Sequence, residues 1–344
     1  MSHHSKVKCI ATLGPKSFDP KIMRAMAEAG ATMFRTNFAH MQRTHYIEVK
    51  RIVDELKADG HDVQLQADLQ GYRVRVGVLP GHGLHLIEQR IYHLVPEGQA
   101  SSAHDIPIDI PDLNEFVKVG QALSFANGLV EAEITRIDGE RITIKTINSG
   151  QIQSHKSINL PESHLQTGIT DKDRSDIEFL IETGVDWIAA SFVANRQDIE
   201  GIRALLGHAP VKIMGKIERR QAIANLEEIV EACDAIMVAR GDLGIELPYE
   251  QIPLIQRNII HLSHKHHTPA VVATQMLYSL VHSTHPTRAE VSDVAFALGM
   301  HADGVLLSDE TSIGIDPVGA VKVLRRILDY NEPLEDAHQN YFDL

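Results

Sequence analysis

The chain is poor in cysteine and in basic residues, and each shortage excludes a class of protein. Its two cysteines, Cys9 and Cys233, are too few for a disulfide framework or a thiolate metal site. Both lie in apolar segments, so we expect buried thiols in a reducing compartment. The 33 lysines and arginines face 46 acidic residues, and the net charge of −13 argues against nucleic acid or an anionic membrane surface as the main partner.

The sequence also lacks long apolar runs. No stretch approaches the roughly 18 apolar residues of a membrane helix, and the N-terminal segment MSHHSKVKCIATLGP has no apolar core of the kind found in signal peptides. We therefore expect a cytoplasmic protein with no membrane partner. The 43% hydrophobic content suffices for a buried core, and 344 residues can hold one large α/β domain with an inserted module.

Histidine, by contrast, is abundant, with 20 residues. Most of them stand in unrelated contexts, and the cluster HLSHKHH has the spacing of a polar edge on a helix. A metal site in this cluster is therefore the less favoured interpretation.

Short apolar runs rich in β-branched residues alternate with stretches of helical spacing along most of the chain. In the second half the runs are VKIMGKIE, DAIMVARGDLGIELP, PAVVATQM and DGVLLSDET. We count three such strands before residue 77 and five after residue 164, with a first helix from Asp19 to Gly30 that Asp19 caps. Polar residues gather where the strands end, which predicts a (β/α)8 barrel, the TIM-barrel fold.

Between Gly77 and His164 the pattern changes to short alternating runs separated by Pro-Gly, Asn-Gly, Asp-Gly and Ser-Gly, which is typical of a small all-β module. We therefore assign residues 1–76 to the first part of the barrel, 77–164 to an inserted β-rich domain forming a small β-barrel, and 165–344 to the second part of the barrel. A module inserted after the third strand would lie at a barrel mouth and could close over a ligand as a lid. A passive decoration is the alternative.

The strand ends carry residues suited to metal and anion chemistry. Lys216 and Glu218 alternate across one strand end, so both point to the same face, and Asp242 follows the next strand. Two carboxylates beside a lysine suggest a divalent cation, Mg2+ or Mn2+, near an anionic substrate, with a structural ion pair as the alternative. The glycines of ARGDLG would let backbone N–H groups approach a carboxylate or phosphate.

Other strand ends add arginines and hydroxyl groups. Arginine at such a position offers bidentate contacts to phosphate. Hydroxyl groups there could relay protons or could simply cap helices. These residues are Arg35 and Asn37 after the second strand, Asp68, Arg73 and Arg75 after the third, Thr274 after the seventh, and Ser308, Asp309 and Glu310 after the eighth.

Read in order, GKIE, ARGDLGIELP, VVATQML and THPTRAEVSDV resemble the pyruvate kinase family, and ATLGPKS, FRTNFAH and SINLP fit earlier motifs of that family. The resemblance spans nearly the whole chain. It implies a (β/α)8 barrel with a β-rich lid after the third strand. It also implies the glycolytic transfer of the phosphoryl group of phosphoenolpyruvate to ADP with Mg2+, giving pyruvate and ATP through positioning and charge neutralisation.

The resemblance also implies roles for individual residues. Lys216 would stabilise the transferring phosphoryl group, Arg35 would grip the phosphate, and Thr274 would lie near the carbon that receives a proton. Glu218 and Asp242 would hold the divalent ion. The implied substrate-binding residues are Arg35, Ser191, Lys216, Gly241, Asp242 and Thr274. The implied nucleotide-binding residues are Pro15, His40, Arg75 and Lys156, with His155 and Lys156 standing where the family has paired lysines.

The chain departs from the family pattern around the third strand. Typical members read Asp-Thr-Lys-Gly-Pro-Glu-Ile-Arg where this chain reads DLQGYRVR, and Asn-Phe-Ser-His where it reads NFAH. The threonine, glutamate and serine of a potassium site are thus missing. We therefore expect no potassium requirement, with the guanidinium of Arg73 supplying the positive charge beside Asn37 and Asp68.

The sequence differs from the family motifs at two more positions, and its C-terminal end suggests a further expectation. Asp309 replaces a glycine of the family motif Ser-Gly-Glu-Thr and adds a carboxylate near an anionic pocket, and Gly215 replaces a proline before the lysine motif. Because the chain stops after the eighth helix, we expect no C-terminal regulatory domain and a homodimer formed by barrel contacts near THPTRAEVSDV. The alternatives are a Mg2+-dependent lyase or aldolase acting through a pyruvate enolate without ADP, and a catalytically weak regulatory homologue.

Overall fold

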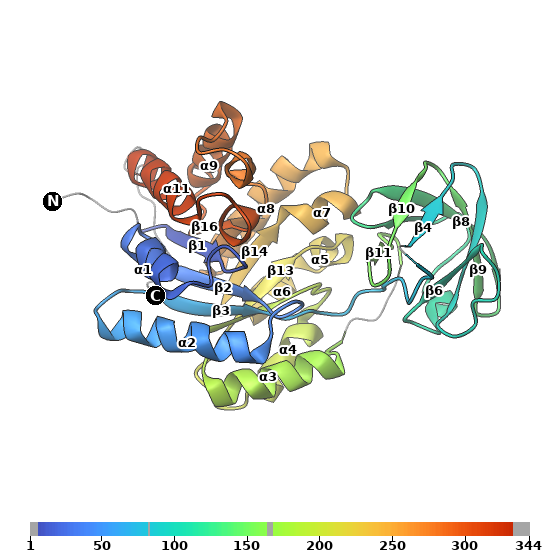
Figure 1. The fold of residues 1–344 in the computed structure, drawn as a ribbon, viewed down its shortest axis with the longest axis horizontal. Helices are drawn as coiled ribbons and strands as arrows, with labels where there is room; N and C mark the ends of the chain where they lie inside the picture. Colours follow the sequence, from blue (N-terminus) through green and yellow to red (C-terminus); the bar gives the residue numbers. More distant parts are fainter. Residues whose placement is uncertain (1–5, 82, 164–167, 333–344) are drawn as a thin grey trace.

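The computed structural model describes residues 6–81, 83–163 and 168–332. Its centre is a closed barrel of eight parallel strands in the order β1-β16-β15-β14-β13-β12-β3-β2 (Figure 1). These strands are β1 (Lys8–Thr12), β2 (Met33–Asn37), β3 (Gln64–Asp68), β12 (Trp187–Ala190), β13 (Lys212–Ile217), β14 (Ala235–Ala239), β15 (Ala270–Ala273) and β16 (Gly304–Leu307). Because β3 pairs with β12 across the insert, the barrel predicted from strand–helix alternation is confirmed.

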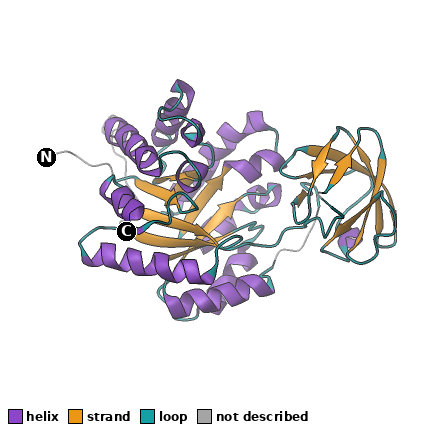
Figure 2. Ribbon diagram, viewed as in Figure 1, coloured by secondary structure: helices purple, strands orange, loops and turns teal. Residues whose placement is uncertain are grey.

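Helices cover the outside of the barrel (Figure 2). The α-helices are α1 (Pro20–Glu28), α2 (Arg43–Ala58), α3 (Asp171–Thr183), α4 (Arg196–Leu206), α5 (Arg220–Ala224), α6 (Leu226–Ala232), α7 (Arg240–Glu246), α8 (Ile252–Lys265), α9 (Arg288–Gly299), α10 (Asp309–Ser312) and α11 (Pro317–Asn331). Short 3-10 helices in the described residues are η1 (Leu113–Glu115), η2 (Tyr249–Gln251) and η3 (Tyr278–Val281). The carboxylate of Asp19 accepts a hydrogen bond from the N–H of Lys21 at 2.8 Å, which is the predicted N-cap.

The strand residues divide between two cores. Alternate residues such as Ile10, Met33, Met214 and Leu306 form a cluster in which every residue is buried, as expected for side chains that fill a barrel interior. The neighbouring residues of the same strands pack outward against the helices in a second, larger cluster. Trp187 belongs to the first cluster, and its indole Nε1 donates to Oε1 of Gln64 at 2.9 Å.

The inserted segment forms β-sheet with its own core. A six-stranded sheet has the order β11-β7-β8-β9-β5-β6, and a two-stranded sheet joins β10 to β4. The strands are β4 (Leu84–Leu86), β5 (Ile91–Pro96), β6 (Asp105–Ile108), β7 (Ala122–Phe125), β8 (Val130–Asp138), β9 (Arg141–Thr146), β10 (Gly150–Ile152) and β11 (Ile158–Asn159). The predicted limit between residues 164 and 165 lies outside the described residues, and the limit at residues 76 and 77 stays a prediction.

The two segments that link insert and barrel are hydrogen-bonded to each other. Arg75 forms an antiparallel bridge with Ser157. The N–H of Val76 donates to the carbonyl of Lys156 at 2.8 Å, and the N–H of Ile158 donates to the carbonyl of Val74 at 2.9 Å. The connection is therefore a short two-stranded ribbon.

Both cysteines are buried in the barrel domain, and burial raises the pKa of each thiol to about 12. Because the thiolate is the reactive form, we expect neither cysteine of the native protein to react with a thiol reagent at pH 8. Two thiols per chain should become reactive after denaturation. A disulfide-exchange colour assay with and without guanidinium measures this, and rapid native labelling of either thiol would contradict it.

Gly215 on β13 lies against one of these thiols. A Cβ added at Gly215 would lie 2.6 Å from Sγ of Cys233, which is too close for any side chain. The glycine therefore lets α6 and the segment after it approach the strand that carries Lys216. Within the described residues, no helix combines the length and apolar character needed to cross a membrane.

Candidate active site

A cavity of about 530 Å³ lies at the carboxyl ends of the barrel strands, beneath the insert. Side chains from both parts of the chain line it. From the barrel come Arg35, Asn37, His40, Ser191, Lys216, Glu218 and Asp242, and from the linking ribbon and the insert come Arg73, Arg75 and His155. Parallel strands bring their carboxyl ends to the same edge, so residues distant in sequence meet here. Most of the predicted site residues therefore share one cavity.

Lys216 lies at the centre of a buried charge cluster. Its Nζ is 2.9 Å from Oε1 of Glu218 and 3.3 Å from Oδ2 of Asp68, and it donates to Oγ of Ser191 at 2.9 Å. Nη2 of Arg35 approaches the same Oδ2 of Asp68 at 2.7 Å. Each carboxylate is only 1% exposed, so these charges interact with little screening by water.

The cluster shifts the pKa of its members in different directions. Burial raises the pKa of Asp68, but the nearby Arg35 and Lys216 outweigh it and lower the value to about 2. Burial lowers the pKa of Lys216, but Glu218 and Asp68 raise it more, so the lysine keeps its charge. For Glu218, burial and the charge of Asp242 raise the pKa although Lys216 opposes them. Lys216 therefore does not fully offset the effects of burial and of Asp242 on Glu218.

A divalent ion would fit beside Glu218, whose negative charge is only partly compensated. Glu218 and Asp242 both line the cavity, and the charge of Asp242 reaches Glu218. No group of three or more His, Cys, Asp or Glu side chains suited to a metal occurs in the described part of the chain, including the histidine cluster at the end of α8. An ion held by only two carboxylates keeps open positions for water and substrate oxygens, as Mg2+ sites usually do.

Asp242 is paired with an arginine from the ribbon. Nη2 of Arg73 lies 3.1 Å from Oδ1 of Asp242, and the guanidinium stacks on the ring of Phe192 with its central carbon 4.8 Å from the ring centroid. The same Nη2 donates to Oδ1 of Asn159 at 3.1 Å and to Oδ1 of Asn127 at 3.3 Å, both in the insert. Arg73 therefore joins the insert to α7 through one side chain.

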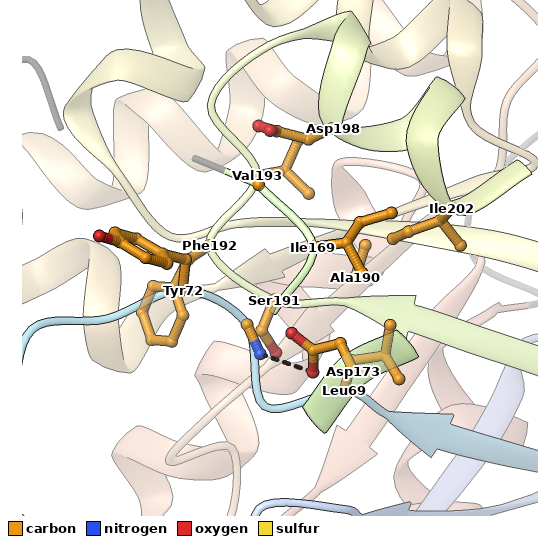
Figure 3. Close-up of a pocket in the computed structure, with 12 residues that line it drawn as sticks. Leu69, Tyr72, Ile169, Asp173, Ala190, Ser191, Phe192, Val193, Asp198 and Ile202 are labelled. Atoms are coloured by element: carbon orange, nitrogen blue, oxygen red, sulfur yellow. Dashed lines mark hydrogen bonds between the residues drawn. The ribbon is translucent and has the colours of Figure 1, made fainter. Parts of the chain in front are cut away.

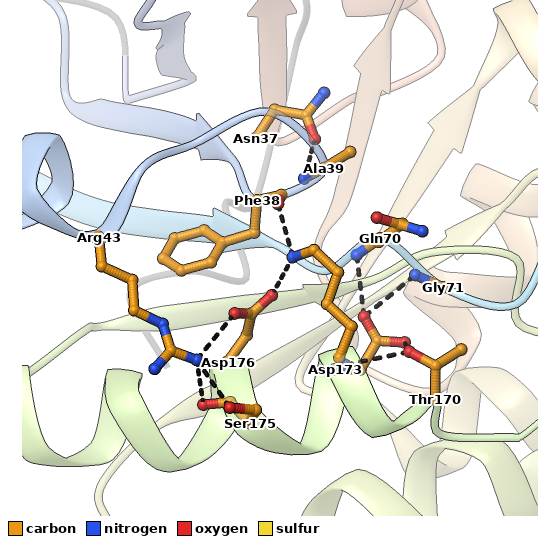
Figure 4. Close-up of polar contacts among 11 residues, drawn as sticks. Asn37, Phe38, Ala39, Arg43, Gln70, Gly71, Thr170, Asp173, Ser175 and Asp176 are labelled. Atoms are coloured by element: carbon orange, nitrogen blue, oxygen red, sulfur yellow. Dashed lines mark hydrogen bonds and ion pairs between the residues drawn. The ribbon is translucent and has the colours of Figure 1, made fainter. Parts of the chain in front are cut away.

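The first turn of α3 holds the loops that carry cavity residues (Figure 4). Oδ1 of Asp173 accepts hydrogen bonds from the N–H groups of Gln70 at 3.0 Å and Gly71 at 3.2 Å. Nζ of Lys172 donates to the carbonyl of Phe38 at 2.9 Å and pairs with Asp176. These contacts fix the segments after β2 and β3, so Asn37 and Arg73 project from a supported backbone.

The turn after β12 is fixed from two sides. Phe192 has a φ of +57°, and its N–H donates to Oε2 of Glu218 at 2.7 Å. A Cβ on Gly71, whose φ is +70°, would lie 2.6 Å from the carbonyl oxygen of Ser191, so only glycine fits there. The void behind this turn measures about 30 Å³ and is lined by Leu69, Tyr72 and Ile202 (Figure 3). It has room for about one ordered water, not for a substrate.

Thr274 and Gly241 lie next to each other but are not among the residues that line the cavity. A Cβ on Gly241 would lie 2.8 Å from Cγ2 of Thr274, which has a φ of +79°. Nη2 of Arg240 donates to the carbonyl of Thr274 at 2.8 Å and also pairs with Asp293, which fixes this unusual backbone. The motif ARGDLGIELP contains the helix α7, which begins at Arg240 directly after β14.

A second cavity of about 410 Å³ adjoins the first and shares Arg35, Asn37 and His40 with it. Pro15 lines this second cavity, and Arg75 lines the first. Lys156 lines neither of the two. Its neighbour His155 reaches the first cavity instead, and its carbonyl accepts from Nη1 of Arg75 at 3.3 Å. The structure therefore brings three of the four predicted nucleotide residues to the two cavities.

Several residues of the site were not predicted. Gln66 is fully buried and its Nε2 donates to Oδ1 of Asp68 at 2.7 Å, which orients that carboxylate. Its position two residues before Asp68 on a strand is the signal that both side chains share a face. No sequence signal indicates Phe192, Asn127 or Asn159, because their role depends on how the insert meets the barrel.

Comparison with known proteins gives consistent matches. The family model described as the pyruvate kinase barrel domain matches residues 4–321. A pyruvate kinase from Agrobacterium vitis is 37% identical over 343 residues, which cover 98% of this chain and 70% of the relative. Pyruvate kinase 2 from Synechocystis is 36% identical over 330 residues, covering 94% of this chain and 56% of the relative. A crystal structure of a pyruvate kinase from Cryptosporidium parvum superposes with a TM-score of 0.92 at 32% identity, covering 96% of this chain and 70% of that one.

Proposed function

Because this chain belongs to the pyruvate kinase family, and is an enzyme of the phosphotransferase kind, we propose that it transfers the phosphoryl group of phosphoenolpyruvate to ADP, giving pyruvate and ATP. The supporting observation is the position of Lys216, in contact with Asp68, Glu218 and Ser191 in a cavity that also contains Arg35. A charged lysine and an arginine at one cavity floor can stabilise charge that develops during phosphoryl transfer.

The roles of the residues follow from their partners. Asp68 holds Arg35 and Lys216 in place from beneath, since it contacts both at 3.3 Å or less. Lys216 and Arg35 would then face the phosphoryl group with their remaining donors. Nε of Arg35 is buried and has no hydrogen-bond partner among the described residues, so it is a donor available to an anionic ligand. Thr274 and the backbone near Gly241 would lie beside the substrate carbons and carboxylate.

Mg2+ or Mn2+ would be held by Glu218 and Asp242. Bound there, the ion would neutralise charge on the phosphoryl and enolate oxygens. The environment of Glu218 supports this assignment: burial and the charge of Asp242 raise its pKa although Lys216 lies 2.9 Å away, so a further cation between the two carboxylates would offset their repulsion. Asp242 must then share its oxygens between the ion and Arg73.

The same reaction would need no potassium. Arg73 already places a positive charge beside Asp242, where it also contacts the insert. A monovalent cation at this place would be repelled by the guanidinium. We further propose that the insert acts as a lid, that the enzyme works in the cytoplasm, and that it forms a homodimer through the barrel.

The decisive experiment supplies purified protein with phosphoenolpyruvate, ADP and Mg2+ and measures pyruvate and ATP separately. The expected result is equal amounts of both products, with turnover changing less than about two-fold when potassium replaces tetramethylammonium at constant ionic strength. Pyruvate without ATP would contradict the kinase reaction and favour a lyase. Strong activation by potassium would contradict the role of Arg73 but leave the kinase reaction standing.

A further inference from the structure

The second cavity has a wall that fits the flat base of a nucleotide. Leu13, Phe18, Met41 and Ile313 line it, and Ile313 is 49% exposed, so an apolar face lies open to the cavity. Arg35, Asn37 and His40 form the border with the first cavity, where the cationic groups lie. An elongated ligand with an anionic end and an apolar, flat end therefore has a complementary surface at each end.

The frame of this cavity is rigid. A Cβ on Gly14 would lie 2.6 Å from Cβ of Ser312, so the loop after β1 contacts α10 directly. The N–H of Lys16 donates to the carbonyl of Ser312 at 3.0 Å, and Oγ1 of Thr311 donates to the carbonyl of Thr12 at 2.9 Å. Residues on this frame are preorganised and lose little conformational freedom when a ligand binds.

The carboxylate of Asp309 lies in this cavity and has no evident role in stabilising the surrounding fold. Asp309 is exposed, and its carboxylate makes no hydrogen bond or ion pair with the part of the chain that the structure describes. Asp309 and Arg35 line the same cavity, so the carboxylate lies within electrostatic range of the anion site. Burial lowers the pKa of the Arg35 guanidinium, but the charges of Asp68, Glu218 and Asp309 raise it more. A carboxylate here would repel a phosphate placed against it. The part of an anionic ligand that lies beside Asp309 is therefore not its phosphate, and a neutral part would be held there through hydrogen-bond donors.

We propose that Asp309 is a specificity residue that recognises two adjacent hydrogen-bond donors on the nucleoside of the phosphoryl acceptor. This inference rests on the proposed function, because it requires a nucleoside diphosphate as acceptor. Two carboxylate oxygens match two parallel donors, as in other bidentate pairs. The donors can be N1–H and the exocyclic amine of guanine, or the two vicinal hydroxyls of ribose. Adenine offers one amine beside an acceptor nitrogen, so its edge matches a carboxylate poorly.

The test compares GDP, IDP, ADP and the 2′-deoxy forms of GDP and ADP as acceptors for the native enzyme and for Asp309→Asn. A good bidentate contact should give roughly ten-fold or greater discrimination in kcat/KM. If the native enzyme prefers GDP over IDP and ADP and the substitution removes this preference, Asp309 binds the guanine base. If the native enzyme prefers ribose over deoxyribose and the substitution removes this preference, Asp309 binds the hydroxyls of the sugar. The KM for phosphoenolpyruvate should stay unchanged in both cases, whereas a general structural defect would move it.

Glu250→Gln is the matched control, because Glu250 is an exposed carboxylate on η2 that lines neither cavity. Titration of each diphosphate by calorimetry repeats the comparison without requiring turnover. The inference is overturned if nucleotides are used or bound equally well before and after Asp309→Asn. Failure of every nucleotide to accept a phosphoryl group, while calorimetry still shows discrimination, would instead overturn the proposed function alone.

Discussion

Replacing Lys216 with methionine should lower kcat for phosphoryl transfer by roughly a thousand-fold or more, because it removes the positive charge nearest to the reacting group. Phosphoenolpyruvate and Mn2+ should still bind, since Arg35, Glu218 and Asp242 keep their positions in the cavity. Steady-state kinetics give the first quantity, and calorimetry with each ligand gives the second. Methionine approximates the length of the lysine stem, so the cavity should keep its shape.

Two measurements separate this catalytic loss from misfolding. In the native protein Asp68 also contacts Arg35 and Gln66, each at 2.7 Å, and we expect both contacts to survive the substitution. Glu218 loses its ion pair but keeps the hydrogen bond from the N–H of Phe192. Thermal unfolding of the variant should therefore remain a single transition. Lys265→Met, which removes an exposed ion pair with Glu227, is the matched control and should keep native turnover. Turnover close to native in Lys216→Met would move the chemistry to another group.

Replacing Arg73 with glutamate should make catalysis depend on a monovalent cation. The substitution removes the ion pair with Asp242 and puts a third carboxylate beside Asp242 and Glu218. Without added potassium, we expect kcat/KM for phosphoenolpyruvate to fall by about a hundred-fold or more, because close like charges oppose an anionic substrate. Added potassium should restore part of the loss.

Arg73→Lys provides the comparison, because it keeps the charge but loses the planar fork that reaches Asn127, Asn159 and Asp242 together. A loss smaller than about ten-fold and no potassium response are expected for lysine. Rates are measured along a titration with potassium chloride at constant ionic strength. Native-like rates for the glutamate variant in the absence of potassium would contradict an electrostatic role for this position.

The sequence predicts the barrel well, because local patterns determine it. The apolar runs of β13 to β16 end in polar residues at regular intervals, and this alternation alone indicates parallel strands with a shared functional edge. The contact between Lys216 and Glu218 could also be predicted, since alternate residues on a strand share a face.

Contacts between the insert and the barrel could not be predicted in the same way. Arg73 meets Asp242 only because the ribbon and α7 converge in space, and no local pattern encodes that approach. The register of the ribbon likewise determines that His155, and not its neighbour Lys156, lines the first cavity, and nucleotide binding by Lys156 stays a prediction. The direction of a side chain in a two-stranded ribbon depends on the register in which the two strands pair. The sequence of one strand alone does not determine that register.

The ribbon that joins the insert to the barrel also limits how the insert can move. Because its two segments hold each other through backbone hydrogen bonds between Val74, Val76, Lys156 and Ile158, neither can lengthen or twist alone. Such a ribbon bends readily across its broad face and resists bending within its plane. If the insert acts as the proposed lid, we expect it to swing about this ribbon, carrying His155 and Arg75 together toward or away from the barrel mouth.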